Sequence, residues 1–145
     1  MNIIHEDLLN ITNGIICHQV NCKGVMGAGL ALSIKTKYPI VYEKYKAIAN
    51  KEMIGNCHIV KISKNFYIAN LFGQKLYGNE KGIIYTDYKA FESAIEKLAK
   101  FAEIDNLEVY FPYGIGSGLG KGNISKINFI ISKYLPTAIL CIKPD

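Results

Sequence analysis

Two glycine-rich segments hold the residues of this chain most suited to chemistry. The first, Asn21 to Ala31, reads NCKGVMGAGLA, and the second, Pro112 to Gly122, reads PYGIGSGLGKG. Each follows an apolar, strand-like run and precedes a helix-like one. Such loops direct backbone N–H groups and the positive end of a helix dipole at their occupant, which is commonly a phosphate. Two of them predict a ligand with a pyrophosphate or with two phosphate groups.

The small residues of the first loop, Gly27, Ala28 and Gly29, are compatible with phosphate binding or with tight packing of a helix on the sheet. Asn21 favours binding, because its amide stands at the end of a strand-like run where it can reach a ribose hydroxyl. The loop lacks the Gly-Lys-Ser/Thr ending of a P-loop nucleotidase, and no acidic residue follows at the spacing of a dinucleotide-binding fingerprint.

The second loop places a glycine at every other position from 114 to 122. Glycine is costly in chain entropy, so this pattern indicates positive φ angles or a close approach of the backbone to a ligand. Tyr113 beside it is placed to stack on a ribose or base, the alternative being an ordinary packed aromatic residue.

The elements that must position these loops alternate between strand and helix. Strands are expected at 2–4, 15–20, 57–62, 65–72, 107–111 and 138–142, and helices at about 27–37, 40–50, 88–103 and 123–134. The run 15–20 is apolar on both faces, as in a sheet covered on both sides. The order predicts an α/β protein, a three-layer α/β/α sandwich around a mixed central sheet, in which ligands bind at the carboxyl ends of the strands.

Bulk composition narrows the class of protein. The 145 residues fit one domain spanning 1–145, half of them hydrophobic and a fifth charged. No apolar run is long enough for a bilayer and the start lacks the pattern of a signal peptide, so we expect a cytoplasmic protein without membrane partners. The net charge of +5 comes without a basic run, which favours a solvated lysine-rich surface over a nucleic-acid footprint. The four cysteines form no C-x-x-C pair, so neither a metal nor a disulfide framework is expected, and no cofactor is expected either.

These motifs together resemble the macrodomain family of ADP-ribose-binding proteins. The resemblance is carried by Glu6–Leu9, Cys17–Ala31, Tyr67–Gln74 and Tyr113–Gly120, in that order, and covers essentially the whole chain. It is strongest to the branch of ADP-ribose-1″-phosphate phosphatases and terminal ADP-ribose glycohydrolases, and it implies a single macrodomain.

The resemblance also implies residue roles. Asp7 matches the acidic residue that accepts from the adenine amino group, the alternative being a capping or turn aspartate. Asn21 matches the asparagine at the distal ribose, and the two loops match those beneath the distal ribose and around the diphosphate. The expected ligand-binding set is Asp7, Gly27, Ala28, Gly29, Tyr113, Ile115, Gly116, Ser117, Gly118, Leu119 and Gly120, and the expected catalytic set is Asn21 and His18.

His18 matches a histidine implicated in catalysis in phosphatase-like members, and an imidazole can protonate a leaving oxygen or activate water. The alternative is a structural histidine satisfied by backbone. The glycohydrolases use a lysine and an aspartate, whereas Gly120 occupies the aspartate position here and Lys75 is better explained as a surface lysine.

We therefore expect a monomeric hydrolase that binds ADP-ribose or a derivative, most simply an ADP-ribose-1″-phosphate phosphatase. The alternatives are a module that binds ADP-ribose-type ligands without turnover, and a glycohydrolase acting on ADP-ribosylated protein or nucleic acid. Nucleic acid is expected only in that last role.

Overall fold

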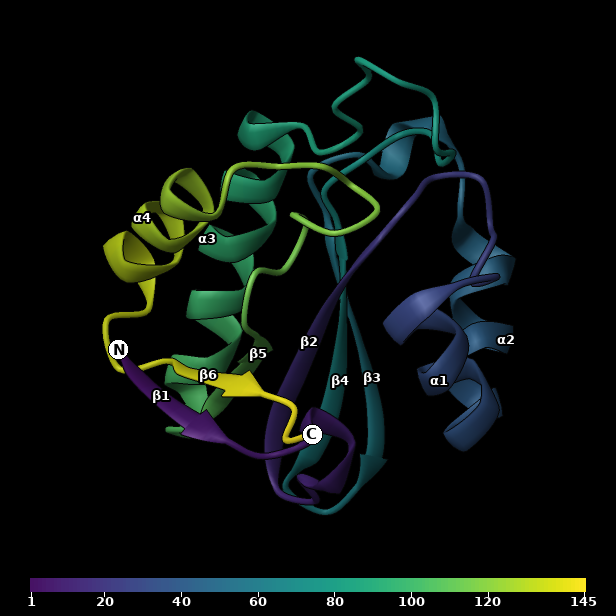
Figure 1. Cartoon of the computed structure of the whole chain (residues 1–145). Helices are drawn as coiled ribbons and strands as arrows, with labels where there is room; N and C mark the ends of the chain where they lie inside the picture. The colour runs from purple at the N-terminus through teal and green to yellow at the C-terminus, as the bar shows by residue number, and fades with distance from the viewer.

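A computed structural model describes residues 1–145 as a mixed six-stranded sheet between two pairs of helices (Figure 1). The strands are β1 (Asn2–His5), β2 (Gly14–Val20), β3 (Cys57–Ser63), β4 (Phe66–Phe72), β5 (Val109–Pro112) and β6 (Ile139–Ile142). The helices are α1 (Gly29–Lys37), α2 (Pro39–Ile48), α3 (Tyr88–Ile104) and α4 (Ile124–Tyr134), with short 3-10 turns η1 (Leu8–Asn10) and η2 (Lys51–Met53). The strand order is β1-β6-β5-β2-β4-β3, and only β3 is antiparallel to its neighbour.

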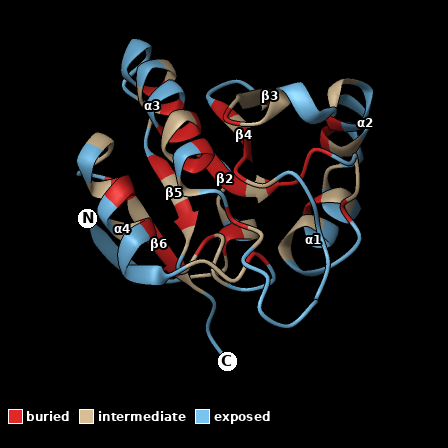
Figure 2. Cartoon of the chain, turned by 90° about the horizontal axis from the view of Figure 1, so that it is seen from above, coloured by how far each residue is buried: buried red, intermediate tan, exposed pale blue.

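The predicted three-layer architecture is confirmed, and strand β2 shows why it forms. Ile15 and Cys17 belong to a core shared with α3 and α4, whereas Ile16 and Val20 belong to a second core shared with α1 and α2. Successive side chains of a strand point to opposite faces, so an uninterrupted apolar run requires a cover on each face. Viewed from above, the buried strands lie between the two helix layers (Figure 2).

The helices begin and end close to the predicted residues, for local reasons. Asp87 and Asn123 cap α3 and α4 by accepting from Ala90 N and Lys126 N, and Pro39 stands in the first turn of α2. The first helix is expected from Gly27 but begins at Gly29, because Ala28 is still extended at φ −153°. No helix of the chain is long and apolar enough to cross a membrane.

Both glycine-rich loops leave the sheet at the carboxyl end of a strand, the first after β2 and the second after β5. They lie at the same end of the molecule, at the top of Figure 1, together with the connection from β4 to α3. The parallel pairing of β2 with β5 explains this placement, because it brings the two carboxyl ends to one edge of the sheet.

Candidate functional site

A cavity of about 690 Å³ opens at this edge, and both glycine-rich loops line it together with Gln74 and Tyr77–Asn79. Of the residues expected from sequence, those that line the cavity are His18, Asn21, Gly27, Ala28, Gly29, Ile115, Gly116, Gly118, Leu119 and Gly120. Asp7, Tyr113 and Ser117 do not line it. The convergence of the two loops on one cavity is the arrangement that the sequence predicted.

The first loop presents unused donors at the start of α1. Ala28, the N-cap, provides no side-chain hydrogen bond, and the amides of Gly27, Ala28 and Gly29 donate to no protein atom. The first turn of a helix has no internal partners for its N–H groups and carries the positive end of the helix dipole. This wall of the cavity is suited to an anionic group.

The second loop lines the same cavity and also presents backbone N–H groups that have no partner in the protein. Those of Gly116, Gly118, Leu119 and Gly120 form no hydrogen bond within the protein, whereas the loop itself is closed by the bond from Gly122 N to Gly116 O at 2.8 Å. Gly116 adopts φ +75°, which a residue with a side chain rarely takes. Ser117 contributes differently from expectation, since its hydroxyl donates to Gly114 O inside the loop.

Asn21 organises the first loop with its side chain. Its Oδ1 accepts from Lys23 N at 3.0 Å and lies 2.8 Å from the Tyr45 hydroxyl, while its Nδ2 donates to Val25 O at 2.9 Å. Asn21 therefore fixes the loop's shape in addition to lining the cavity.

His18 is buried, at 1% exposure, and it also lines the cavity. Its Nε2 lies 2.5 Å from the side-chain oxygen of Asn70, while its Nδ1 has no partner in the protein. Burial lowers the pKa of His18 from 6.5 to about 4, opposed in part by the bond to Asn70. At neutral pH the ring is therefore uncharged, and its Nδ1 is enclosed by protein atoms.

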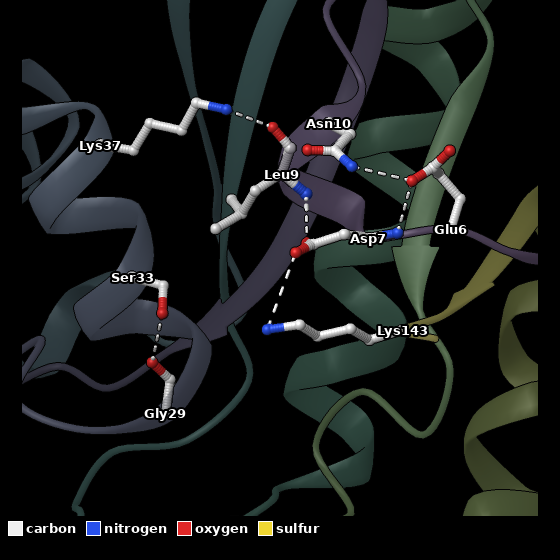
Figure 3. A network of polar contacts seen from close by, with 8 residues as sticks. All are labelled: Glu6, Asp7, Leu9, Asn10, Gly29, Ser33, Lys37 and Lys143. Carbon is white, nitrogen blue, oxygen red and sulfur yellow. Dashed lines mark hydrogen bonds and ion pairs between the residues drawn. The ribbon is translucent and has the colours of Figure 1, made fainter. Parts of the chain in front are cut away.

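Asp7 does not line the cavity, and its carboxylate contacts Leu9 and Lys143 (Figure 3). Its Oδ1 accepts from Leu9 N at 2.9 Å as the cap of η1, and its Oδ2 lies 3.7 Å from Lys143 Nζ. The capping role that the sequence left as an alternative is therefore present. Tyr113, also expected in the site, is 42% exposed and stands outside the cavity lining.

Beneath the second loop lies a set of hydrogen-bonded polar side chains, Gln19, Gln74 and Thr86, which the sequence did not predict and which we call the Gln19–Thr86 pillar. Gln19 Nε2 donates to Thr86 Oγ1 at 2.9 Å and to Gln74 Oε1 at 2.7 Å, and the Thr86 hydroxyl donates to Gly116 O at 2.7 Å. The sequence signal that could have revealed these contacts is Gln19 itself, a polar residue within the buried run of β2, because a buried polar group needs hydrogen-bond partners.

This pillar explains the glycine at position 120. A Cβ there would stand 2.5 Å from Thr86 Oγ1 and 2.7 Å from Gly116 O, so no side chain fits.

Lys75 is exposed and outside the cavity, and no charged side chain lines the cavity at all. The cavity lining contains neither a lysine nor an aspartate.

Comparison with known proteins agrees with this geometry. No family model matches the chain. A curated relative, the ADP-ribose 1″-phosphate phosphatase of Meyerozyma guilliermondii, is 24% identical over 88% of this chain and 83% of its own. A Bacteroides thetaiotaomicron protein of unknown function superposes with a TM-score of 0.85 at 26% identity, covering 99% of this chain and 97% of that chain.

Two further structures extend the comparison. A macrodomain protein from Streptomyces coelicolor has a TM-score of 0.77 at 21% identity, covering 99% of both chains. Thermosipho africanus DarTG in complex with ADP-ribose has a TM-score of 0.79 at 19% identity, covering 98% of this chain and 41% of that chain. The chain therefore has the macrodomain fold.

Proposed function

We propose that this macrodomain binds ADP-ribose 1″-phosphate and hydrolyses it to ADP-ribose and phosphate. The free amides of the second loop hold the diphosphate. Those of the first loop and of the α1 N-terminus surround the 1″-phosphate, whose charge they stabilise. The ADP-ribose bound to DarTG and the activity named for the Meyerozyma relative support this ligand class.

The observation that carries the reaction is a neutral, buried His18 in the lining of a cavity without charged side chains, whose enclosed Nδ1 has no hydrogen-bond partner in the protein. In the proposed step, water attacks phosphorus and the bond from phosphorus to the C1″ oxygen breaks. Nδ1 accepts a proton from the water, and the leaving oxygen finally receives it. With its pKa at about 4, His18 is neutral at pH 7 and enters the reaction as a proton acceptor; it becomes a donor only after it has taken the proton of the attacking water.

The test is phosphate release from ADP-ribose 1″-phosphate by wild type and by His18→Gln. Glutamine retains an amide N–H for Asn70, and its amide oxygen accepts hydrogen bonds but is too weak a base to take a proton from water. We expect kcat to fall by about 100-fold or more with KM little changed, in line with the loss of a general base. His5→Gln makes the same exchange at an exposed histidine and serves as the control. Turnover that survives His18→Gln would exclude this role.

A second candidate is a module that binds ADP-ribose without turnover. It is favoured by one observation, namely that no charged side chain lines the cavity, so backbone donors supply affinity but little acid–base chemistry. Calorimetry with ADP-ribose, combined with the phosphate-release assay, distinguishes the phosphatase from the binding module. Binding accompanied by no phosphate release over a long incubation would select the binding module, and no heat with ADP-ribose would exclude both.

A further inference from the structure

Gln19 stands near the carboxyl end of β2, in the lining of the cavity, with its carboxamide enclosed by three glycines. A Cβ at Gly73 would overlap Gln19 Oε1, and a Cβ at Gly116 would stand 3.1 Å from the same oxygen. A Cβ at Gly120 would stand 3.0 Å from Gln19 Nε2. The residue after β4 and the second loop therefore leave together the space that this carboxamide fills.

Two backbone oxygens fix which atoms donate in the hydrogen bonds of Gln19. A carbonyl oxygen can only accept, so the Thr86 hydroxyl gives its one proton to Gly116 O at 2.7 Å, and Thr86 Oγ1 accepts from Gln19 Nε2 at 2.9 Å. At the other end Gln74 Nε2 donates to Leu76 O at 2.7 Å, so Gln74 Oε1 accepts the second Nε2 proton of Gln19, also at 2.7 Å. Both protons of one NH₂ group are used, and neither amide can be reversed without placing two acceptors against each other.

The two acceptors of this NH₂ group connect different walls of the cavity. Gln74 and Thr86 lie at the two ends of the connection from β4 to α3, which we call the connecting segment (residues 74–86). This segment contributes Tyr77–Asn79 to the cavity lining. Thr86 does not line the cavity, but its hydroxyl holds the carbonyl of Gly116 in the second loop. One NH₂ group therefore joins the start of the connecting segment to the second loop.

The two hydrogen bonds of the Gln19 amide depend on each other. The last torsion of a glutamine side chain has a broad energy profile, so hydrogen bonds decide where the plane of its amide points. Loss of the acceptor on Gln74 leaves that plane free to tilt away from Thr86. A hydroxyl that accepts a hydrogen bond is also a stronger donor, so Thr86 holds Gly116 O best while Gln19 donates to it.

We propose that Gln19 is a positioning residue that couples the connecting segment to the second loop, so that the two walls hold the ligand as one surface. The effect on ligand binding rests on the proposed function, whereas the coupling of the two segments is a property of the protein alone. An apolar side chain of similar length at position 19 would fill the space between the glycines but would donate to neither segment.

Amide hydrogen exchange in the ligand-free protein tests the coupling from both sides. Gly122 N donates to Gly116 O at 2.8 Å and reports on the second loop. Cys22 N donates to Lys75 O at 3.0 Å and reports on the connecting segment. Leu135 N, which is hydrogen-bonded at the end of α4, reports on any general loosening of the fold.

Three variants each remove one member of the Gln19–Thr86 pillar and keep a side chain of similar size: Gln19→Met, Gln74→Met and Thr86→Val. Thr86→Ser retains the hydroxyl. Thr36→Val is the matched control, because the Thr36 hydroxyl also donates to a backbone oxygen, at 2.9 Å, but in α1 and outside the cavity lining. Gln74 is only half-buried, so Gln74→Met provides the readout if a variant at the buried Thr86 does not fold.

In Gln74→Met we expect hydrogen exchange at Gly122 to accelerate by about threefold to tenfold, although the Gln74 side chain forms no hydrogen bond with the second loop. In Thr86→Val, exchange at Cys22 accelerates by a similar factor. In Gln19→Met, exchange accelerates at both reporters. Exchange at the α4 reporter is unchanged in all three, and the serine variant and the α1 control match wild type.

Calorimetry with ADP-ribose and steady-state phosphate release test the consequence for the ligand. Because Thr86 does not line the cavity, Thr86→Val removes no ligand contact of its own. We expect its Kd and KM to rise by about threefold to tenfold with kcat within about twofold of wild type, since His18 is unchanged. Thr86→Ser should restore both constants.

The inference is overturned if exchange accelerates only on the side of the substitution, at Cys22 in Gln74→Met and at Gly122 in Thr86→Val, or accelerates equally at Leu135. Coupled exchange with an unchanged Kd, in a protein that binds ADP-ribose, overturns the role in binding. Coupled exchange in a protein that gives no heat with ADP-ribose supports the coupling by Gln19 and counts against the proposed function alone. The failure of the inference and the failure of the proposed function are therefore distinguishable.

Discussion

The Tyr45 hydroxyl of α2 lies 2.7 Å from the backbone oxygen of Asn21 and 2.8 Å from its side-chain oxygen. Tyr45 is fully buried against Phe72, with ring centroids 5.7 Å apart. Burial raises the pKa of Tyr45, so the phenol stays protonated and can donate. A helix on one face of the sheet thereby holds the residue that shapes the first loop.

Tyr45→Phe removes that donor and leaves the ring packing in place. We expect a loss of about 1–2 kcal/mol in the free energy of unfolding, because the backbone and side-chain oxygens of Asn21 lose a buried hydrogen-bond donor, and a several-fold weaker affinity for ADP-ribose. Urea unfolding and calorimetry measure the two effects. Tyr42→Phe is the matched control, since its hydroxyl only reaches Gly24 O at 3.4 Å. Equal effects of the two substitutions would contradict the role of Tyr45.

Two glycines of the second loop should respond in opposite ways to alanine. A Cβ at Gly120 would lie within 2.7 Å of both Thr86 Oγ1 and Gly116 O, whereas a Cβ at Gly118 would meet nothing within 4 Å. We expect Gly120→Ala to cost about 1–3 kcal/mol by displacing the Gln19–Thr86 pillar. Gly118→Ala should change stability by less than about 0.5 kcal/mol. Thermal unfolding of both variants tests this difference. A Gly120→Ala variant as stable as wild type would show that the side chains of Gln19 and Thr86 can move aside without a cost in stability.

Much of the architecture was accessible from sequence because local signals agreed with the global fold. The double-sided apolar run of β2, the alternation of strands and helices, and the glycine loops after strands predicted the layers and the site's edge. The resemblance to macrodomains placed His18 and Asn21 in the site, and the cavity lining includes both.

The partners of these residues were not accessible, because they depend on strand order and register. Asn70 meets His18 only because β4 pairs with β2 in the observed register, and His58 joins through β3 on the far side. Thr86 reaches Gly116 across thirty positions. Asp7 shows the opposite case, in which a local contact could be predicted. The sequence analysis already gave a capping role as the alternative to ligand binding, and in the structure one carboxylate oxygen of Asp7 caps η1.

The buried His18 makes stability depend on pH in a defined window. Its pKa in the folded protein, about 4, lies below the unfolded value of 6.5, so the unfolded chain binds the proton more readily between these limits. The contribution is complete above pH 6.5 and is lost as pH falls toward 4. From pH 7 to 5 the loss is about 2 kcal/mol. Urea unfolding should show this extra loss in wild type relative to His18→Gln, and parallel pH dependences in the two proteins would contradict it.

Lys75 tests the remaining alternative, removal of ADP-ribose from modified macromolecules. Its side chain is exposed and outside the cavity lining, and only its backbone oxygen takes part in the site's structure, by accepting from Cys22 N at 3.0 Å. Alanine keeps that backbone bond, so we expect Lys75→Ala to hydrolyse ADP-ribose 1″-phosphate within about twofold of wild type, as surface substitutions usually do. The same pair of proteins is assayed for release of ADP-ribose from modified protein and DNA. Release by wild type that disappears in Lys75→Ala would require the lysine to reach the distal ribose, and hence a rearrangement of residues 74–84 that this structure does not contain.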